Sequence, residues 1–148
     1  MQELIDKANN GNAEAQLELG FNYLQGRNGF PENDTEAFKW FKKAAGQNYP
    51  MGLCMVGELY QYGYGVARDY DTAVMWYKRS ADLNCGRAEF RLGWLYAHAN
   101  TKAYFGNNNL EYSPDLAATY YARALRHGYK DTFGILDYFE ETGRLPLF

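Results

Sequence analysis

Few side chains in this sequence have the chemistry of a catalytic or metal-binding site. The chain has two histidines, His98 and His127, and two cysteines, Cys54 and Cys85. Their spacing matches no metal-ligand pattern, and no Ser-His-Asp arrangement is recognisable. The run Gly63-Tyr64-Gly65 belongs to a turn between helices, where both glycines suit positive φ. We therefore predict no catalytic residue, no metal and no cofactor, and we expect that the protein is not an enzyme.

The composition excludes several classes of protein. The 148 residues are 47% hydrophobic and 22% charged, which is typical of a single globular domain. A net charge of −3 gives no basic field for nucleic acid. Because no stretch approaches the roughly 20 apolar residues that span a bilayer, we expect no membrane insertion. Met1 to Asn12 lacks the apolar core of a secretory signal, and two cysteines are too few for a disulfide framework, so we expect a cytoplasmic protein.

A glycine recurs at nearly constant spacing along the chain. Gly20, Gly57 and Gly93 stand 37 and 36 residues apart, and a tyrosine follows each of them after three residues. Periodicity of this length is the sequence signature of a repeat protein.

A second motif has the same period until an insertion interrupts it. Trp76 follows Trp40 after 36 residues, but the matching Tyr120 follows after 44. One insertion of eight residues between His98 and Ser113 explains the change, because the pattern resumes after it.

Each repeat is predicted to contain two helices. Apolar residues have helical spacing in the first half. The second helices have capping residues at their starts, namely Asn33 or Asp34, then Asp71, and then Ser113 with Pro114 in the first turn. Charges of each sign gather at the helix end that suits the macrodipole, which predicts solvated helix faces rather than ligand sites. The acidic group is Asp34, Glu36, Asp69, Asp71 and Asp115, and the basic group is Lys42, Lys43, Lys78, Arg79, Arg123 and Arg126.

The repeated glycines predict where the two helices of a pair cross. Glycine within a helix costs about 1 kcal/mol relative to alanine, so its recurrence needs a compensating contact. Without a Cβ, the first helix can approach the second closely. We expect alanines to face the glycines (Ala37, Ala73, Ala117) and aromatic residues to fill the layer beside the contact (Trp40, Trp76, Tyr120).

These residues resemble the Sel-one-like repeat family, which is related to the tetratricopeptide repeats. The middle repeat carries the motif most fully, with Val56-Gly57, Tyr60, Gly63-Tyr64-Gly65-Val66, Asp69, Ala73, Trp76-Tyr77 and Ser80-Ala81. The first repeat has a longer loop at Gly26 to Phe30, and the third has Ala99 in place of a loop glycine. The resemblance implies an all-α superhelix, or solenoid, of about three helix-turn-helix repeats with a C-terminal capping helix.

The register divides the chain, taken as one domain of residues 1–148, into repeats and caps. Residues 1–12 are expected to form an N-terminal half-helix cap, and 13–48, 49–84 and 85–128 the repeats. Residues 129–148 are the C-terminal cap, in which Asp131 to Thr142 forms a lone first helix followed by Gly143. Asp137 replaces the crossing glycine there, and Leu145, Leu147 and Phe148 are expected to fold back on this helix.

The resemblance to tetratricopeptide arrays implies that first helices line a concave face, which is the binding surface of many solenoids. Counting in register from the glycine gives an apolar and aromatic surface with scattered charges, a blend typical of peptide grooves. The alternative is that these side chains only tighten neighbouring helices. The candidates are Glu14, Leu17, Phe21, Leu24, Gln25, Met51, Cys54, Glu58, Gln61, Tyr62, Arg87, Phe90, Trp94, Ala97, His98, Asp131, Tyr138 and Glu141.

The insertion at Thr101 to Tyr112 is a second candidate for partner binding. It offers Tyr104, Phe105 and Asn108, and ordered loops on rigid scaffolds often carry function. A tolerated insertion without a role is the alternative.

The leading functional hypothesis is an interaction module or adaptor that binds a segment of another protein or peptide in its groove. An inhibitor or immunity-type protein that neutralises a toxin or enzyme is the alternative, on the evidence of size and acidity. A hydrolase is the competing class. Because Cys54 and Cys85 are not one repeat apart, they do not resemble the per-repeat disulfides of the cysteine-rich branch with which hydrolase activity is associated. The oligomeric state stays open.

Overall fold

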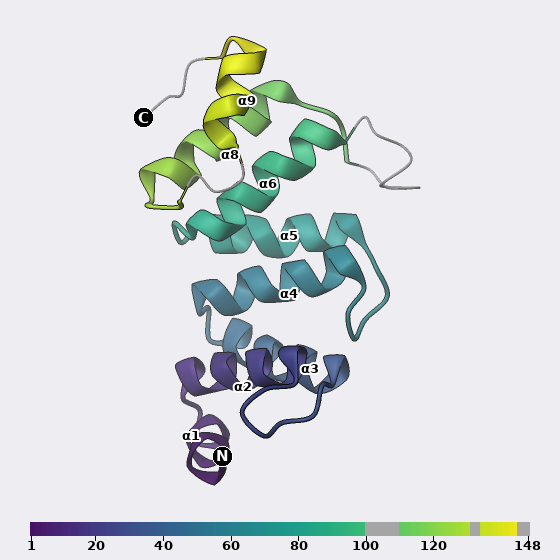
Figure 1. The fold of residues 1–148 in the computed structure, drawn as a ribbon, viewed down its shortest axis with the longest axis vertical. Coiled ribbons are helices and arrows are strands. Elements are labelled where there is room, and N and C mark those ends of the chain that lie inside the picture. Colours follow the sequence, from purple (N-terminus) through teal and green to yellow (C-terminus); the bar gives the residue numbers. More distant parts are fainter. Residues whose placement is uncertain (100–109, 131–133, 145–148) are drawn as a thin grey trace. The chain divides into compact units, whose positions relative to one another are not determined.

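The computed structural model describes residues 1–99, 110–130 and 134–144, and its regular elements there are all α-helices (Figure 1). The candidate loop residues Tyr104, Phe105 and Asn108 lie outside these ranges, as do Asp131 and the tail residues Leu145, Leu147 and Phe148. The helices are α1 (Gln2–Asn9), α2 (Ala13–Gln25), α3 (Asp34–Gly46), α4 (Pro50–Tyr62), α5 (Tyr70–Ala81), α6 (Gly86–His98), α8 (Pro114–Arg126) and α9 (Ile135–Thr142).

Side-chain caps start the second helix of each repeat, and two of the three were predicted correctly. The Asn33 side chain accepts the Glu36 N–H before α3, and Ser113 Oγ accepts the Leu116 N–H before α8. The prediction of Asp71 as the cap of α5 is wrong. Asp69 accepts the Thr72 N–H at 3.0 Å, whereas Asp71 already lies in the first helical turn. A cap must directly precede the helix, and α5 begins one residue before Asp71.

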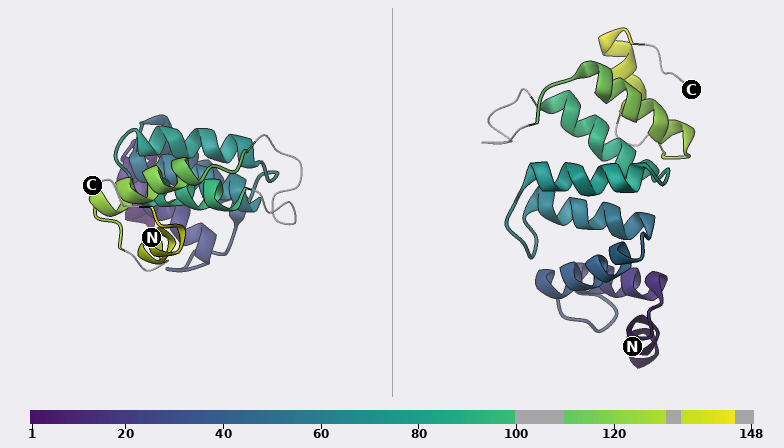
Figure 2. Two further views of the ribbon diagram at one scale, coloured as in Figure 1. Left: turned by 90° about the horizontal axis from the view of Figure 1, so that it is seen from above. Right: turned by 180° about the vertical axis from the view of Figure 1, so that it is seen from behind.

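Left-handed glycines end several first helices, as the repeat pattern predicts. Gly63 follows α4 with φ 72°, and Gly143 follows α9 with φ 68°. Ala99, which replaces the loop glycine after α6, stays in right-handed helical geometry with φ −63°. At Gly65 there is also no room for a side chain, because a Cβ there would lie 2.4 Å from the Asp34 carbonyl oxygen. Figure 2 shows this loop reaching the start of α3.

The chain divides into two compact units, Met1–Trp76 and Tyr77–Phe148. In the first unit, α2 crosses α3 at Gly20, where a Cβ would lie 2.5 Å from the Phe41 ring. Phe41 is fully buried in a core that includes Leu53, Val56 and Leu59 of α4. A second core cluster joins α1, α2 and α3 through Ala8, Leu19 and Trp40.

The second unit repeats the same crossing between α6 and α8. A Cβ on Gly93 would lie 2.5 Å from the Tyr121 ring. The predicted close approach at Gly20 and Gly93 is therefore confirmed, but its expected partner is wrong. Aromatic rings, not the alanines, supply the nearest atoms, because a flat ring fills the space that a missing Cβ leaves. Ala37 and Ala117, which precede Phe41 and Tyr121 by four residues each, are fully buried.

No described helix has both the length and the apolar character needed to cross a bilayer.

Candidate partner-binding surface

The residues predicted for the first repeat lie along one side of α2. Leu17, Phe21 and Leu24 are partly buried and pack against the core cluster of α3 and α4. The Phe21 ring meets Phe41 edge-on, with ring centroids 5.1 Å apart. Glu14 and Gln25 are exposed on the same helix. The result is a half-buried apolar stripe, Leu17-Phe21-Leu24, which we name the α2 stripe.

The predicted residues of α4 divide into exposed and buried groups. Met51 is partly buried against the same core cluster as the α2 stripe. Tyr62 is 45% exposed and stacks on Tyr64 with ring centroids 5.7 Å apart. Glu58 and Gln61 are buried, and Glu58 Oε2 lies 3.6 Å from the Cys54 thiol. We therefore leave Cys54, Glu58 and Gln61 out of the candidate surface.

In the second unit, the predicted residues of α6 are mostly half-buried. This is true of Arg87, Trp94 and His98. The Trp94 and His98 rings stack at a centroid distance of 4.4 Å, and His98 Nδ1 lies 2.8 Å from the Trp94 carbonyl oxygen.

Phe90 is buried within an aromatic cluster rather than lying on the surface. It stacks on Tyr129 at 5.0 Å and approaches Tyr121 at 5.9 Å. Tyr138 of α9 meets Tyr121 edge-on at 5.0 Å. Burial raises the pKa of both tyrosine hydroxyls, Tyr121 and Tyr138, because the charged phenolate is poorly solvated there.

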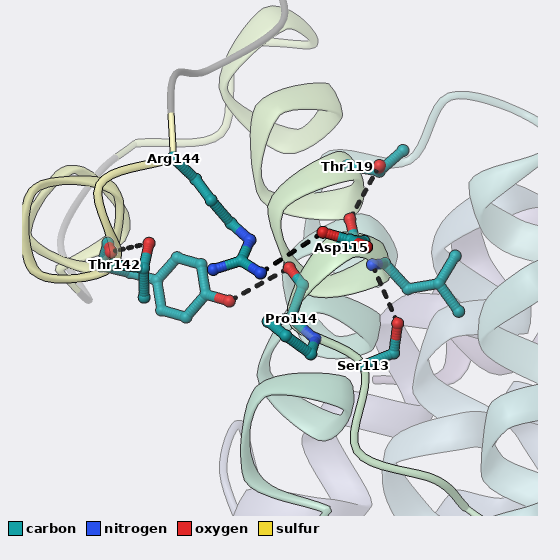
Figure 3. A network of polar contacts seen from close by, with 8 residues as sticks. Ser113, Pro114, Asp115, Thr119, Thr142 and Arg144 are labelled. Carbon is teal, nitrogen blue, oxygen red and sulfur yellow. Dashed lines mark hydrogen bonds and ion pairs between the residues drawn. The ribbon is translucent and has the colours of Figure 1, made fainter.

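The half-buried Tyr138 and the following Arg144 dock α9 onto the start of α8, and Figure 3 shows Arg144 reaching toward Asp115. The Tyr138 hydroxyl donates to the Pro114 carbonyl at 3.2 Å, and the Tyr138 carbonyl accepts the Thr142 hydroxyl. Arg144 reaches the Asp115 carboxylate at 3.3 Å. These contacts assign Tyr138 a structural role in addition to any role in binding.

Sequence reasoning missed a buried ionic cluster in the second unit. Glu89 is fully buried, with its two oxygens 2.6 Å from His127 Nδ1 and 2.8 Å from Arg123 Nε. Arg123 also donates to the Ala81 carbonyl, so its assignment to a solvated face is wrong. The missed signal was the repeat register. Glu89 lies four residues before the crossing glycine, at the position where Gln16 and Leu53 are buried.

Among the described residues, no group of three or more histidine, cysteine, aspartate or glutamate side chains could hold a metal ion. Cys54 is buried and Cys85 is half-buried, and neither forms a disulfide bond with another described residue.

Parts of this chain are similar in sequence to known proteins. The chain is 36% identical over 89 residues to the chitin synthase regulator SKT5 of Malassezia restricta, covering 60% of this chain and 6% of that protein. It is also 36% identical over 64 residues to the ERAD-associated E3 ubiquitin-protein ligase component HRD3A of Arabidopsis thaliana, covering 43% and 9%. The chain thus spans less than a tenth of the length of either relative.

A solved structure and a family model agree with the fold. The crystal structure of a Sel1 repeat protein from Oxalobacter formigenes matches 90% of this chain and 51% of its own, with a TM-score of 0.77 and 30% identity. The model of the Sel1 repeat matches residues 13–49, 50–85 and 86–129. The predicted resemblance and the all-α repeat fold are therefore confirmed, and this chain belongs to the Sel1 repeat family.

Proposed function

We propose that this protein is a non-catalytic interaction module that binds a segment of another protein along α2, the first helix of its first repeat. The observation that carries the proposal is the α2 stripe. Its three side chains lie at helical spacing, pack on the core of α3 and α4, and are only partly buried. Partly buried apolar groups on an ordered scaffold are typical of the anchoring positions in protein interfaces.

The relatives support a role in binding rather than in catalysis. One is named as a regulator of chitin synthase and another as a component of a ubiquitin ligase. Both names describe proteins that act with an enzyme. Membership of the same repeat family favours an adaptor role for this chain. The lack of a disulfide between the two cysteines, both of which the structure describes, is compatible with the cytoplasmic setting that we propose.

The test is affinity capture of partners from the source organism, identified by mass spectrometry, with matched variants of the bait. Phe21→Ser removes the central side chain of the α2 stripe and should reduce recovery of the partner at least tenfold, as expected for a hot-spot aromatic. Met75→Ser is the control, because Met75 is 64% exposed on the second helix α5. It should leave recovery unchanged.

A second variant separates loss of binding from loss of folding. Gln25 is exposed one helical turn after Phe21 and contributes nothing to the core clusters. Gln25→Arg should weaken capture while the melting temperature stays within a degree or two of the unsubstituted protein. Equal recovery with all three baits would contradict the proposal.

A further inference from the structure

A pocket lies between α1 and α2 in the first unit, at the end of α2 opposite Leu24. Its volume is about 370 Å³, which lies within the usual range for sites that receive a side chain or small ligand. The residues that line it are Met1, Glu3, Leu4, Lys7, Asn12, Glu14, Ala15 and Glu18.

The pocket combines an apolar wall with a negative rim. Leu4 is half-buried and Ala15 is buried, so they provide apolar surface. Glu3 is partly neutralised by Lys7, whose Nζ lies 3.4 Å from its carboxylate. Glu14 and Glu18 are exposed, and neither makes an ion pair with any residue that the structure describes. Two carboxylates of the pocket therefore have no cationic partner within this part of the chain.

The pocket and the α2 stripe lie on one continuous side of α2. Residues three and four apart are neighbours on a helix surface, so Glu14 adjoins Leu17 and Glu18, and these in turn adjoin Phe21. The opposite side of α2 is buried through Ala15, Leu19 and Asn22. A segment that crosses the exposed side of α2 would meet apolar groups first and then the acidic pocket.

We propose that the pocket receives a lysine or arginine side chain of the partner segment, whose neighbouring apolar residues contact the α2 stripe. This inference rests on the proposed function. A basic side chain fits both parts of the pocket, because its aliphatic stem packs on apolar surface while its charged head stays at the wet rim. There the head pairs with Glu14 and Glu18, and an arginine can bind a carboxylate through two parallel hydrogen bonds.

The test is selection from a phage-displayed library of random 12-residue peptides against the full chain, followed by fluorescence anisotropy with the selected peptides. We expect the peptides to combine apolar residues with at least one lysine or arginine. Glu14→Gln with Glu18→Gln should weaken their binding about fivefold, consistent with two exposed ion pairs. High salt should weaken binding to the unsubstituted chain and have less effect on this double variant.

The control is Asp137→Asn with Glu140→Gln on α9, which removes the same net charge from two exposed positions in the other unit. This control should bind the peptides as the unsubstituted chain does. If both double variants bind equally, or if the selected peptides lack basic residues, the pocket proposal is wrong. The proposed function still stands in that case if Phe21→Ser abolishes binding. Peptides that bind independently of Phe21, or a selection that returns none, would count against both.

Discussion

Glu89 Oε1 lies 2.6 Å from His127 Nδ1, and this pair stands at the same repeat positions as the hydrogen-bonded Gln16 and Gln47, 2.9 Å apart, in the first unit. In both units the contact ties the start of a first helix to the residue just after the second. Glu89 differs from Gln16 in its charge, which Arg123 balances through a short ion pair at 2.8 Å rather than a well-aligned hydrogen bond. The contact between these two repeat positions therefore occurs in both units. It involves a charged carboxylate in the second unit and two neutral amides in the first.

Removing Glu89 should destabilise the second unit strongly. Glu89→Ala leaves Arg123 without its carboxylate, so we expect a loss of about 2–3 kcal/mol, less than for a fully buried pair because Arg123 and His127 are partly exposed. His127→Gln copies the amide of Gln47 and can still donate to Glu89, so its cost should stay below about 1 kcal/mol. Urea unfolding of both variants measures the difference, and equal losses would show that the carboxylate is not the centre of the cluster.

The crossing glycine of α2 should not tolerate even a methyl group. Gly20→Ala places a Cβ 2.5 Å from the Phe41 ring, and relieving this contact should cost about 1–3 kcal/mol. Gly46→Ala is the matched control, because Gly46 ends α3 with no atom near the new Cβ. It should be neutral or stabilising by up to about 1 kcal/mol, since alanine favours the helix. Chemical denaturation checks both, and a neutral Gly20→Ala would remove the packing argument for the repeat.

Asp69, and not Asp71, should be the carboxylate that supports the start of α5. The backbone N–H and then the hydroxyl of Thr72 lower the pKa of Asp69 below 3.8. Its contribution to stability is therefore present above that pH and is lost as the pH falls through the lower folded-state pKa. Asp69→Ala should cost about 1 kcal/mol at neutral pH, and Asp71→Ala should cost less. Thermal unfolding at pH 7 distinguishes them, and the reverse order would restore the cap predicted from the sequence.

Alkaline pH should destabilise the second unit through its buried tyrosine. Tyr121 is 4% exposed, and burial holds its pKa above the unfolded value of about 10. The folded state therefore keeps a proton that the unfolded chain releases. The stability this provides is complete below about pH 10 and declines as the pH rises further.

Tyr121→Phe should make the loss of stability between pH 8 and pH 11 smaller. Some loss should remain, because burial also raises the pKa of Tyr120 and of Tyr138. Urea midpoints at the two pH values give the comparison, with Tyr62→Phe as the control at an exposed position. An unchanged pH dependence in Tyr121→Phe would mean that this hydroxyl is solvated in solution.

The repeat architecture could be predicted from the sequence because its signals are local. The spacing of Gly20 and Gly93 fixed the helix pairs, and Asn33 and Ser113 marked where α3 and α8 begin. Each signal depends on one residue and its immediate backbone. The prediction of the α5 cap failed because Asp69 and Asp71 are both plausible caps within three residues. Only the hydrogen bond from the Thr72 N–H to Asp69 distinguishes them.

The packing and the charge pairing could not be predicted as well because they depend on residues distant in sequence. Whether an alanine or Phe41 meets Gly20 depends on the rotation of α3 about its axis, which periodicity leaves uncertain. Glu89 and His127 are 38 residues apart, and no local pattern pairs them. The burial of Glu58 and Phe90 shows the same limit, because a register position defines a direction and not the neighbours that cover it.

Site-specific photocrosslinking tests most directly the claim that a partner segment lies on α2. Benzoylphenylalanine is placed at position 21 in one protein and at position 75 in another, and both are irradiated in extracts of the source organism. If a partner segment lies on α2, position 21 should give a discrete crosslinked partner and position 75 should give none. Crosslinking at 75 alone, or the same products from both positions, would contradict the claim.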